Sequence, residues 1–139
     1  MRYTFLVAVL ALSVALSIVG FLNSRPDETL SAYGAGAREW QLQSINGTDF
    51  AARATIAFPQ EGRITGRAPC NTYTATQKIP YPWFEISDLT VTKMACEDMA
   101  SETAFFQMLG KMALVEVLDN LLVLSTETGE EMVFTAAAP

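Results

Sequence analysis

Short alternations of apolar and polar residues, separated by turn residues, extend from Trp40 to Phe134. Successive side chains of a strand point to opposite faces, so this alternation is typical of strands that bury one face. Asn46-Gly47 lies between two such segments and predicts a tight turn, because both residues tolerate positive φ. The chain from Trp40 onward therefore predicts about six short antiparallel strands.

A single segment, residues 96–112, has a helical period instead. Phe105, Leu109 and Met112 recur on one helical stripe, which needs an apolar surface to cover it. The prediction is an α+β fold, in which a small antiparallel β-sheet is curved around one amphipathic helix. An N-terminal hydrophobic segment precedes this fold.

That hydrophobic segment, residues 1–22, has Arg2 followed by an uncharged apolar run from Phe5 to Leu22. A secretory signal peptide has an apolar core of about 7–15 residues, and a membrane-spanning helix needs about 20. No small-residue cleavage site follows the run closely, which favours a signal anchor over a cleaved signal peptide. The positive-inside rule then places the rest of the chain on the periplasmic side of the inner membrane. Cleavage would instead release it into the periplasm or to the outside.

Small, polar and breaker residues dominate residues 23–37, which predicts a linker. The remaining residues, 38–135, have the length of one domain.

The charge and composition exclude several classes of function. The net charge is −6 with a pI near 4.5, which argues against binding of nucleic acid. The chain has no histidine, so catalytic triads with histidine and zinc sites with imidazole are excluded. Glu97, Asp98 and Glu102 are close in sequence but lack the spacing of a calcium loop, and acids are common at helix starts. We expect no metal and no cofactor.

The chain has two cysteines, Cys70 and Cys96. Outside the cytoplasm such a pair is usually a disulfide, and the spacing is not that of a C-x-x-C redox motif. Two alternatives stay open. The cysteines are free buried thiols, or they act as a redox or nucleophilic pair in which Lys93 favours the Cys96 thiolate.

A family resemblance depends on residues spread along the whole exported part, in chain order Trp40, Leu42, Asn46-Gly47, Ile56, Phe58, Gly62, Gly66, Cys70-Asn71-x-Tyr73, Thr92-Lys93-Met94-Ala95-Cys96, Glu102 and Phe106. This series resembles the META domain of HslJ-like bacterial envelope proteins. One departure is Pro69, where the family usually has glycine. The resemblance implies a small α+β domain exported to the cell envelope and a link to heat stress and novobiocin resistance, and it implies no reaction.

The aromatic residues Tyr73, Tyr81, Trp83 and Phe84 are candidates for a recognition surface. Two prolines flank Tyr81, which predicts exposure of this stretch. We therefore expect a non-enzymatic envelope module for binding or stress response, with an envelope protein or an apolar ligand as its partner. The alternative is a thiol-dependent redox or hydrolytic enzyme that uses Cys70 and Cys96.

Overall fold

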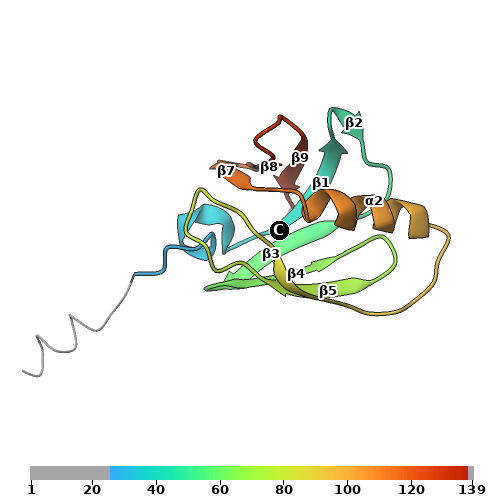
Figure 1. Ribbon diagram of the computed structural model, residues 1–139, viewed down its shortest axis with the longest axis horizontal. Helices are drawn as coiled ribbons and strands as arrows, with labels where there is room; N and C mark the ends of the chain where they lie inside the picture. The colour runs from blue at the N-terminus through green and yellow to red at the C-terminus, as the bar shows by residue number, and fades with distance from the viewer. Residues whose placement is uncertain (1–25, 138–139) are drawn as a thin grey trace, which may run out of the picture.

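The computed structural model describes residues 26–137, so the signal peptide or signal anchor predicted over residues 1–22 lies outside it. The described chain forms nine strands, one α-helix and a short helical turn (Figure 1). In chain order these are η1 (Ser31–Ala35), β1 (Glu39–Ile45), β2 (Thr48–Asp49), β3 (Thr55–Gln60), β4 (Arg63–Arg67), β5 (Thr72–Thr76), β6 (Ser87–Val91), α2 (Met99–Leu109), β7 (Leu114–Leu118), β8 (Leu121–Ser125) and β9 (Glu131–Ala136). Neither helical element of residues 26–137 combines the length and hydropathy of a membrane span.

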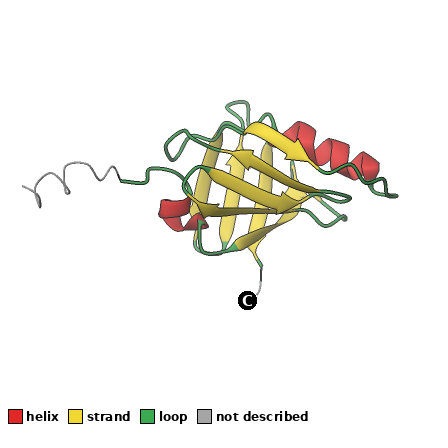
Figure 2. Cartoon of the chain, turned by 90° about the horizontal axis from the view of Figure 1, so that it is seen from below, coloured by secondary structure: helices red, strands yellow, loops and turns green. Residues whose placement is uncertain are grey.

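All strands pair antiparallel in one curved sheet, in the order β6-β5-β4-β3-β1-β9-β8-β7, with β2 attached to β1. The sheet forms a half-barrel, and α2 lies along one of its rims (Figure 2). An antiparallel sheet with one helix was predicted, but the estimate of about six strands was wrong, and the fold is mostly β. The strand most clearly missed is β5, whose inward residues are Tyr73 and Ala75. Alanine contributes little to an apolar alternation, so the sequence pattern was too weak to predict this strand.

The hydrophobic core fills the concave side of the sheet. Its largest fully buried side chains come from β1, β3, β4, β8, β9 and α2, from the residue before η1 and from the connection between β5 and β6: Trp40, Phe84, Phe105, Phe134, Leu30, Leu42, Ile56, Ile64, Leu109, Leu122, Leu124 and Met132. Phe105 and Leu109 are the residues of α2 that enter this core, as the helical stripe predicted. Met112 is also buried, but it follows the end of the helix.

The segment before β1 belongs partly to the folded domain. Leu30 and Ala35 are fully buried, and the Trp40 indole donates a hydrogen bond of 3.1 Å to the carbonyl of Ala35. Hydrogen bonds from the hydroxyls of Ser31 and Thr29 lower the pKa of the Asp27 carboxyl at the start of this segment. Within the linker predicted over residues 23–37, Thr29, Leu30 and Ala35 are therefore buried against the domain.

The turn at Asn46-Gly47 lies where the sequence predicted it. Asn46 and Gly47 have φ values of 50° and 75° in the turn between β1 and β2. Asp88 has a φ of 50°, and the pairing of β5 with β6 is irregular there. Strand β3 continues through Pro59, and its register with β4 shifts between Ala57 and Gln60.

We expect Gly66→Ala to destabilise the fold. Gly66 lies opposite Tyr73 in the ladder of β4 and β5. A Cβ atom there would lie 2.6 Å from Cζ of Tyr73 and would also collide with the carbonyl of Thr55. Overpacking of this kind costs about 1–3 kcal/mol of unfolding free energy, which urea denaturation measures.

Gly110→Ala is the matched control for this substitution. Gly110 has a φ of −69°, and the nearest atom to an added Cβ is the carbonyl oxygen of Phe106 at 3.4 Å. The Gly110→Ala variant should lose no more than about 0.5 kcal/mol of unfolding free energy. Equal losses for the two variants would contradict the steric explanation.

Candidate functional site

Two cysteines hold the connection between β4 and β5 in place. Cys70 and Cys96 form a disulfide, with 5.7 Å between their Cα atoms and a sequence separation of 26. The predicted pairing of these cysteines is therefore present. It attaches this connection to the segment that leads into α2.

Glu102, in the first turn of α2, binds the same connection. Its Oε2 atom accepts hydrogen bonds of 2.8 Å from the backbone amides of Cys70 and Asn71, and Oε1 accepts one of 2.6 Å from the Asn71 side chain. The side chain is only 5% exposed, so three donors take the place of water around the carboxylate. Within residues 26–137, no three cysteine or acidic side chains lie close enough to hold a metal ion.

Asn71 completes this network by binding the segment before α2. Its Oδ1 atom accepts hydrogen bonds from the amide of Met94 at 2.6 Å and from the hydroxyl of Thr92 at 2.9 Å. Its Nδ2 atom donates to the carbonyl of Met94 at 3.0 Å. One side-chain amide thus pairs with both backbone groups of a residue, as a neighbouring strand would. We call Cys70, Asn71, Cys96 and Glu102 the helix lock.

Tyr73 belongs to the core and not to the predicted recognition surface. It is 2% exposed, and its hydroxyl donates a hydrogen bond of 2.8 Å to the carbonyl of Thr55. Its ring lies edge-on to Phe106, with 5.3 Å between the centroids. Burial raises the pKa of the Tyr73 phenol, and the charge of Glu39 adds to this effect. The side chain of β5 that was assigned to the surface points inward.

The other predicted aromatic residues divide between core and surface. Phe84 is 2% exposed and belongs to the core. Tyr81 is half-buried and stacks on Tyr33, with ring centroids 4.7 Å apart. Trp83 is 51% exposed. The structure therefore places Tyr81 and Trp83 on one loop, and Tyr33, which was not predicted, stacks on Tyr81.

The outer face of β4, β5 and β6 carries a row of hydroxyl and guanidinium groups. Arg63, Thr65 and Arg67 lie opposite Thr76, Thr74 and Thr72 in the β4–β5 ladder, and Thr74 lies opposite Thr90 on β6. On β4 and β5 the alternate residues Ile64, Tyr73 and Ala75 are buried, so the residues between them face outward. We call this row the threonine–arginine face, made of Arg63, Thr65, Arg67, Thr72, Thr74, Thr76, Thr90 and Thr92.

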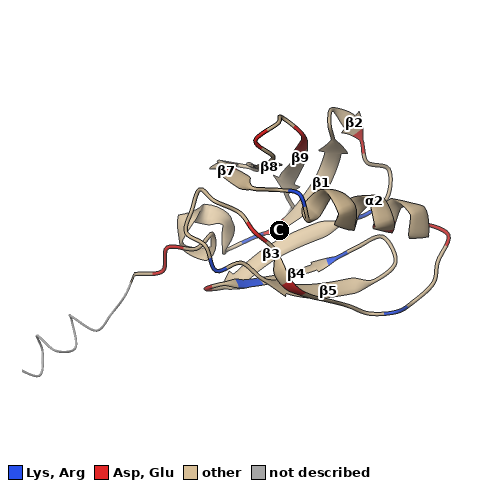
Figure 3. Ribbon diagram, viewed as in Figure 1, with Lys and Arg blue, Asp and Glu red and all other residues tan. Residues whose placement is uncertain are grey.

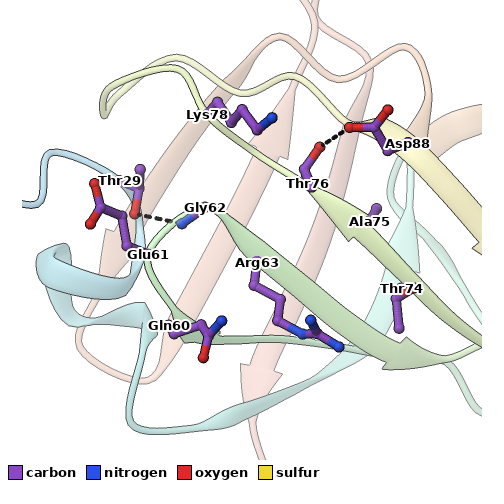
Figure 4. Close-up of a pocket in the computed structure, with 10 residues that line it drawn as sticks. All are labelled: Thr29, Gln60, Glu61, Gly62, Arg63, Thr74, Ala75, Thr76, Lys78 and Asp88. Carbon is purple, nitrogen blue, oxygen red and sulfur yellow. Dashed lines mark hydrogen bonds between the residues drawn. The ribbon is translucent and has the colours of Figure 1, made fainter.

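A shallow hollow of about 470 Å³ opens at one end of this face. Figure 4 shows Lys78 reaching toward Thr76 and Asp88 from one side, while Arg63 extends over β4 on the other. The Thr76 hydroxyl donates a hydrogen bond of 2.8 Å to Asp88, and Thr29 accepts one of 3.3 Å from the amide of Gly62. The hollow is lined by Thr29, Gln60, Glu61, Gly62, Arg63, Thr74, Ala75, Thr76, Lys78 and Asp88.

A second hollow, of about 450 Å³, adjoins the first through Thr74. It is lined by Glu39, Thr65, Gly66, Arg67, Thr72, Tyr73, Thr74, Thr90, Val91 and Thr92. Basic residues mark both ends of β4 (Figure 3). The ion pairs within residues 26–137 join Arg53 to Glu39 and Lys111 to Glu130, so the cations of the two hollows are unpaired in this part of the chain.

This face was not predicted, although the sequence contains a signal for it. Thr72-x-Thr74-x-Thr76 and Arg63-x-Thr65-x-Arg67 alternate with inward residues, so each strand presents its polar side chains on one surface. The predicted strands rested only on their apolar residues, so the surface formed by the polar residues between them was not predicted.

Removing the disulfide should destabilise the protein. We expect Cys70→Ala to lower the free energy of unfolding by about 2–4 kcal/mol, because the cross-link restricts the unfolded chain. Denaturation of the oxidised protein, the reduced protein and the variant measures this loss. The reduced protein should match the variant, and an unchanged midpoint after reduction would contradict the expectation.

Glu102→Gln should also destabilise the protein. The amide replaces one acceptor oxygen by a donor that faces other donors, at a cost of about 1–3 kcal/mol. Glu97→Gln, at an exposed neighbouring position, is the control and should change stability by less than about 0.5 kcal/mol. Because Glu102 and the disulfide hold the same connection, their losses should not add in the double variant. Simple additivity would contradict a shared role.

Solved structures of similar fold support this architecture. A protein from Burkholderia xenovorans, solved by NMR, is 18% identical, with a TM-score of 0.62 and coverage of 84% of this chain and 92% of that one. A crystal structure of a DUF4847 family protein from Bacteroides vulgatus is 14% identical, with a TM-score of 0.58 and coverage of 75% and 94%. A further NMR structure is 20% identical, with a TM-score of 0.60 and coverage of 77% and 95%. At these identities the likeness concerns the fold alone.

No curated protein is significantly similar to the chain. The family model of the META domain matches residues 34–139, which is most of the chain and includes the whole helix lock and the threonine–arginine face. The chain therefore belongs to the META domain family.

Proposed function

We propose that this protein is a non-enzymatic binding module of the cell envelope, and that its threonine–arginine face binds an acidic saccharide. The observation that carries this proposal is the row of hydroxyl groups, flanked by Arg63, Arg67 and Lys78, over two adjoining hollows. Guanidinium groups bind carboxylates in a bidentate geometry, and threonine hydroxyls both donate and accept hydrogen bonds. A ligand with carboxylates and many hydroxyls matches both groups.

The acidic residues in the hollows narrow the class of ligand. Glu39, Glu61 and Asp88 line them together with the cations, so the face has mixed charge. Carboxylates accept hydrogen bonds from sugar hydroxyls but repel a dense polyanion. This favours a ligand with separated anionic groups over nucleic acid.

The cellular location is part of the proposal. The uncharged run from Phe5 to Leu22 supports a signal anchor, with the domain on the periplasmic side of the inner membrane. The disulfide between Cys70 and Cys96 supports an oxidising compartment. Cleavage of the segment would release the same binding module into the periplasm. The resemblance to HslJ-like proteins supports a role in stress response.

The thiol-dependent enzyme has less support. The two sulfur atoms are bonded to each other, so no thiolate is present until a reductant acts. The nearby Glu102 carboxylate accepts three hydrogen bonds within the protein. Its oxygens are therefore occupied by structural donors and do not face a substrate.

Titration calorimetry with trigalacturonic acid tests the binding proposal. Binding should be measurable with this acidic trisaccharide and at least about tenfold weaker with a neutral trisaccharide, a difference of about 1.4 kcal/mol. Arg63→Ala and Arg67→Ala should each weaken binding by a similar factor. Arg38→Ala is the matched control, since Arg38 binds the carbonyl of Asp119 outside both hollows. Equal loss in the control, or no difference between the two saccharides, would overturn the proposal.

A further inference from the structure

Three aromatic residues belong to the end of the domain formed by η1 and residues 78–83. Tyr33 is 48% and Trp83 51% exposed, and Tyr81 stacks on Tyr33. The amide of Trp83 donates a hydrogen bond of 3.0 Å to the carbonyl of Pro80, which holds the loop in a tight turn. We call Tyr33, Tyr81 and Trp83 the aromatic end. Tyrosine and tryptophan are enriched at membrane interfaces, because each combines an apolar ring with a polar group.

The chain enters the domain at this same end. The amide of Tyr81 donates a hydrogen bond of 2.9 Å to the carbonyl of Glu28, two residues after the first described residue, Pro26. Pro26 and Pro80 also line one small hollow. In Figure 1, residues 26–30 leave the domain beside η1, at the end opposite the segment that leads into α2.

Only three residues separate Pro26 from Leu22, the end of the apolar run. Four steps of an extended chain span at most about 14 Å. The polar layer of a bilayer is about 5–8 Å thick on each side. With the apolar run inserted in the membrane, as proposed for the anchor, Pro26 lies no more than about 14 Å from the hydrocarbon. This distance is about twice the thickness of one polar layer. The surface next to Pro26 is the aromatic end.

We propose that the aromatic end rests in the headgroup region of the membrane, with Trp83 and Tyr33 as its interfacial contacts. This inference rests on the proposed membrane attachment and is independent of the saccharide. The charges at this end do not explain docking, because Glu28, Glu61 and Glu85 outnumber Lys78 among its exposed residues. Docking should therefore depend on the aromatic rings and not on anionic lipid.

The two tryptophans of the chain provide the test. Trp40 is fully buried and Trp83 is exposed, so a quencher placed in the headgroup region distinguishes them. The full chain is reconstituted in phosphatidylcholine vesicles whose acyl chains are brominated near the headgroup. About half of the emission should be lost relative to unbrominated vesicles, also in about 1 M salt, where charges are screened beyond about 3 Å.

Two variants identify the quenched residue. Trp83→Phe should leave only the unquenched emission of Trp40. Adding Met94→Trp to this variant places a probe at the far end of the domain, where Met94 is 67% exposed and its backbone is held by Asn71. That probe should remain unquenched.

Each other outcome overturns the inference in a distinct way. A full chain that does not float with vesicles overturns it together with the anchor. Flotation without quenching of Trp83 overturns the docking alone. A requirement for anionic lipid would assign the contact to Lys78 and not to the rings. Protection of Trp83 from iodide in detergent, rising with protein concentration, would assign the aromatic end to a second copy of the chain. Saccharide binding is measured separately and can fail or succeed in any of these cases.

Discussion

A single carboxylate, that of Glu102, connects the helix of this domain to its sheet. It accepts hydrogen bonds from two consecutive backbone amides and from the side chain of Asn71, which in turn holds both backbone groups of Met94. A buried carboxylate without donors is strongly unfavourable, so these three donors must be in place when α2 packs. The disulfide fixes the same connection covalently. The positions of α2, of the segment before it and of β5 are therefore set together.

This arrangement explains why the most recognisable part of the sequence is not the candidate binding site. Cysteines, an amide, a buried tyrosine and a glutamate are residue types that also occur in active sites. Here each of them has a partner within the protein, and together they join α2 to the sheet. The threonine–arginine face consists of ordinary surface residues, which form one continuous surface only because the register of β4, β5 and β6 aligns them. Its components are far less distinctive than the motif beside them.

The same contrast separates what the sequence predicted from what it could not. The turn at Asn46-Gly47, the stripe of Phe105 and Leu109 and the cysteine pair depend on local spacing or on residue type, and all three were predicted. The direction of Tyr73 was not, because Gly66 on the neighbouring strand makes the room for its ring. The hollows were not predicted either, since they require β4, β5 and β6 to be aligned residue by residue. Long-range register is not visible in one chain read from end to end.

Strand β5 has a consequence for how such a domain can diversify. Its inward residues, Tyr73 and Ala75, are fixed by the core, whereas Thr72, Thr74 and Thr76 point away from it, and of these three Thr76 is hydrogen-bonded to Ser87 and Asp88 on β6. Since a strand separates its two faces completely, the outer set can change without altering the inner one. The helix lock keeps the backbone of this strand in place from one end. The outer face can therefore serve as a surface for engineered recognition, in which every second position of β4 and β5 is changed to alter binding specificity. The residues between these positions face the core and maintain the stability of the fold.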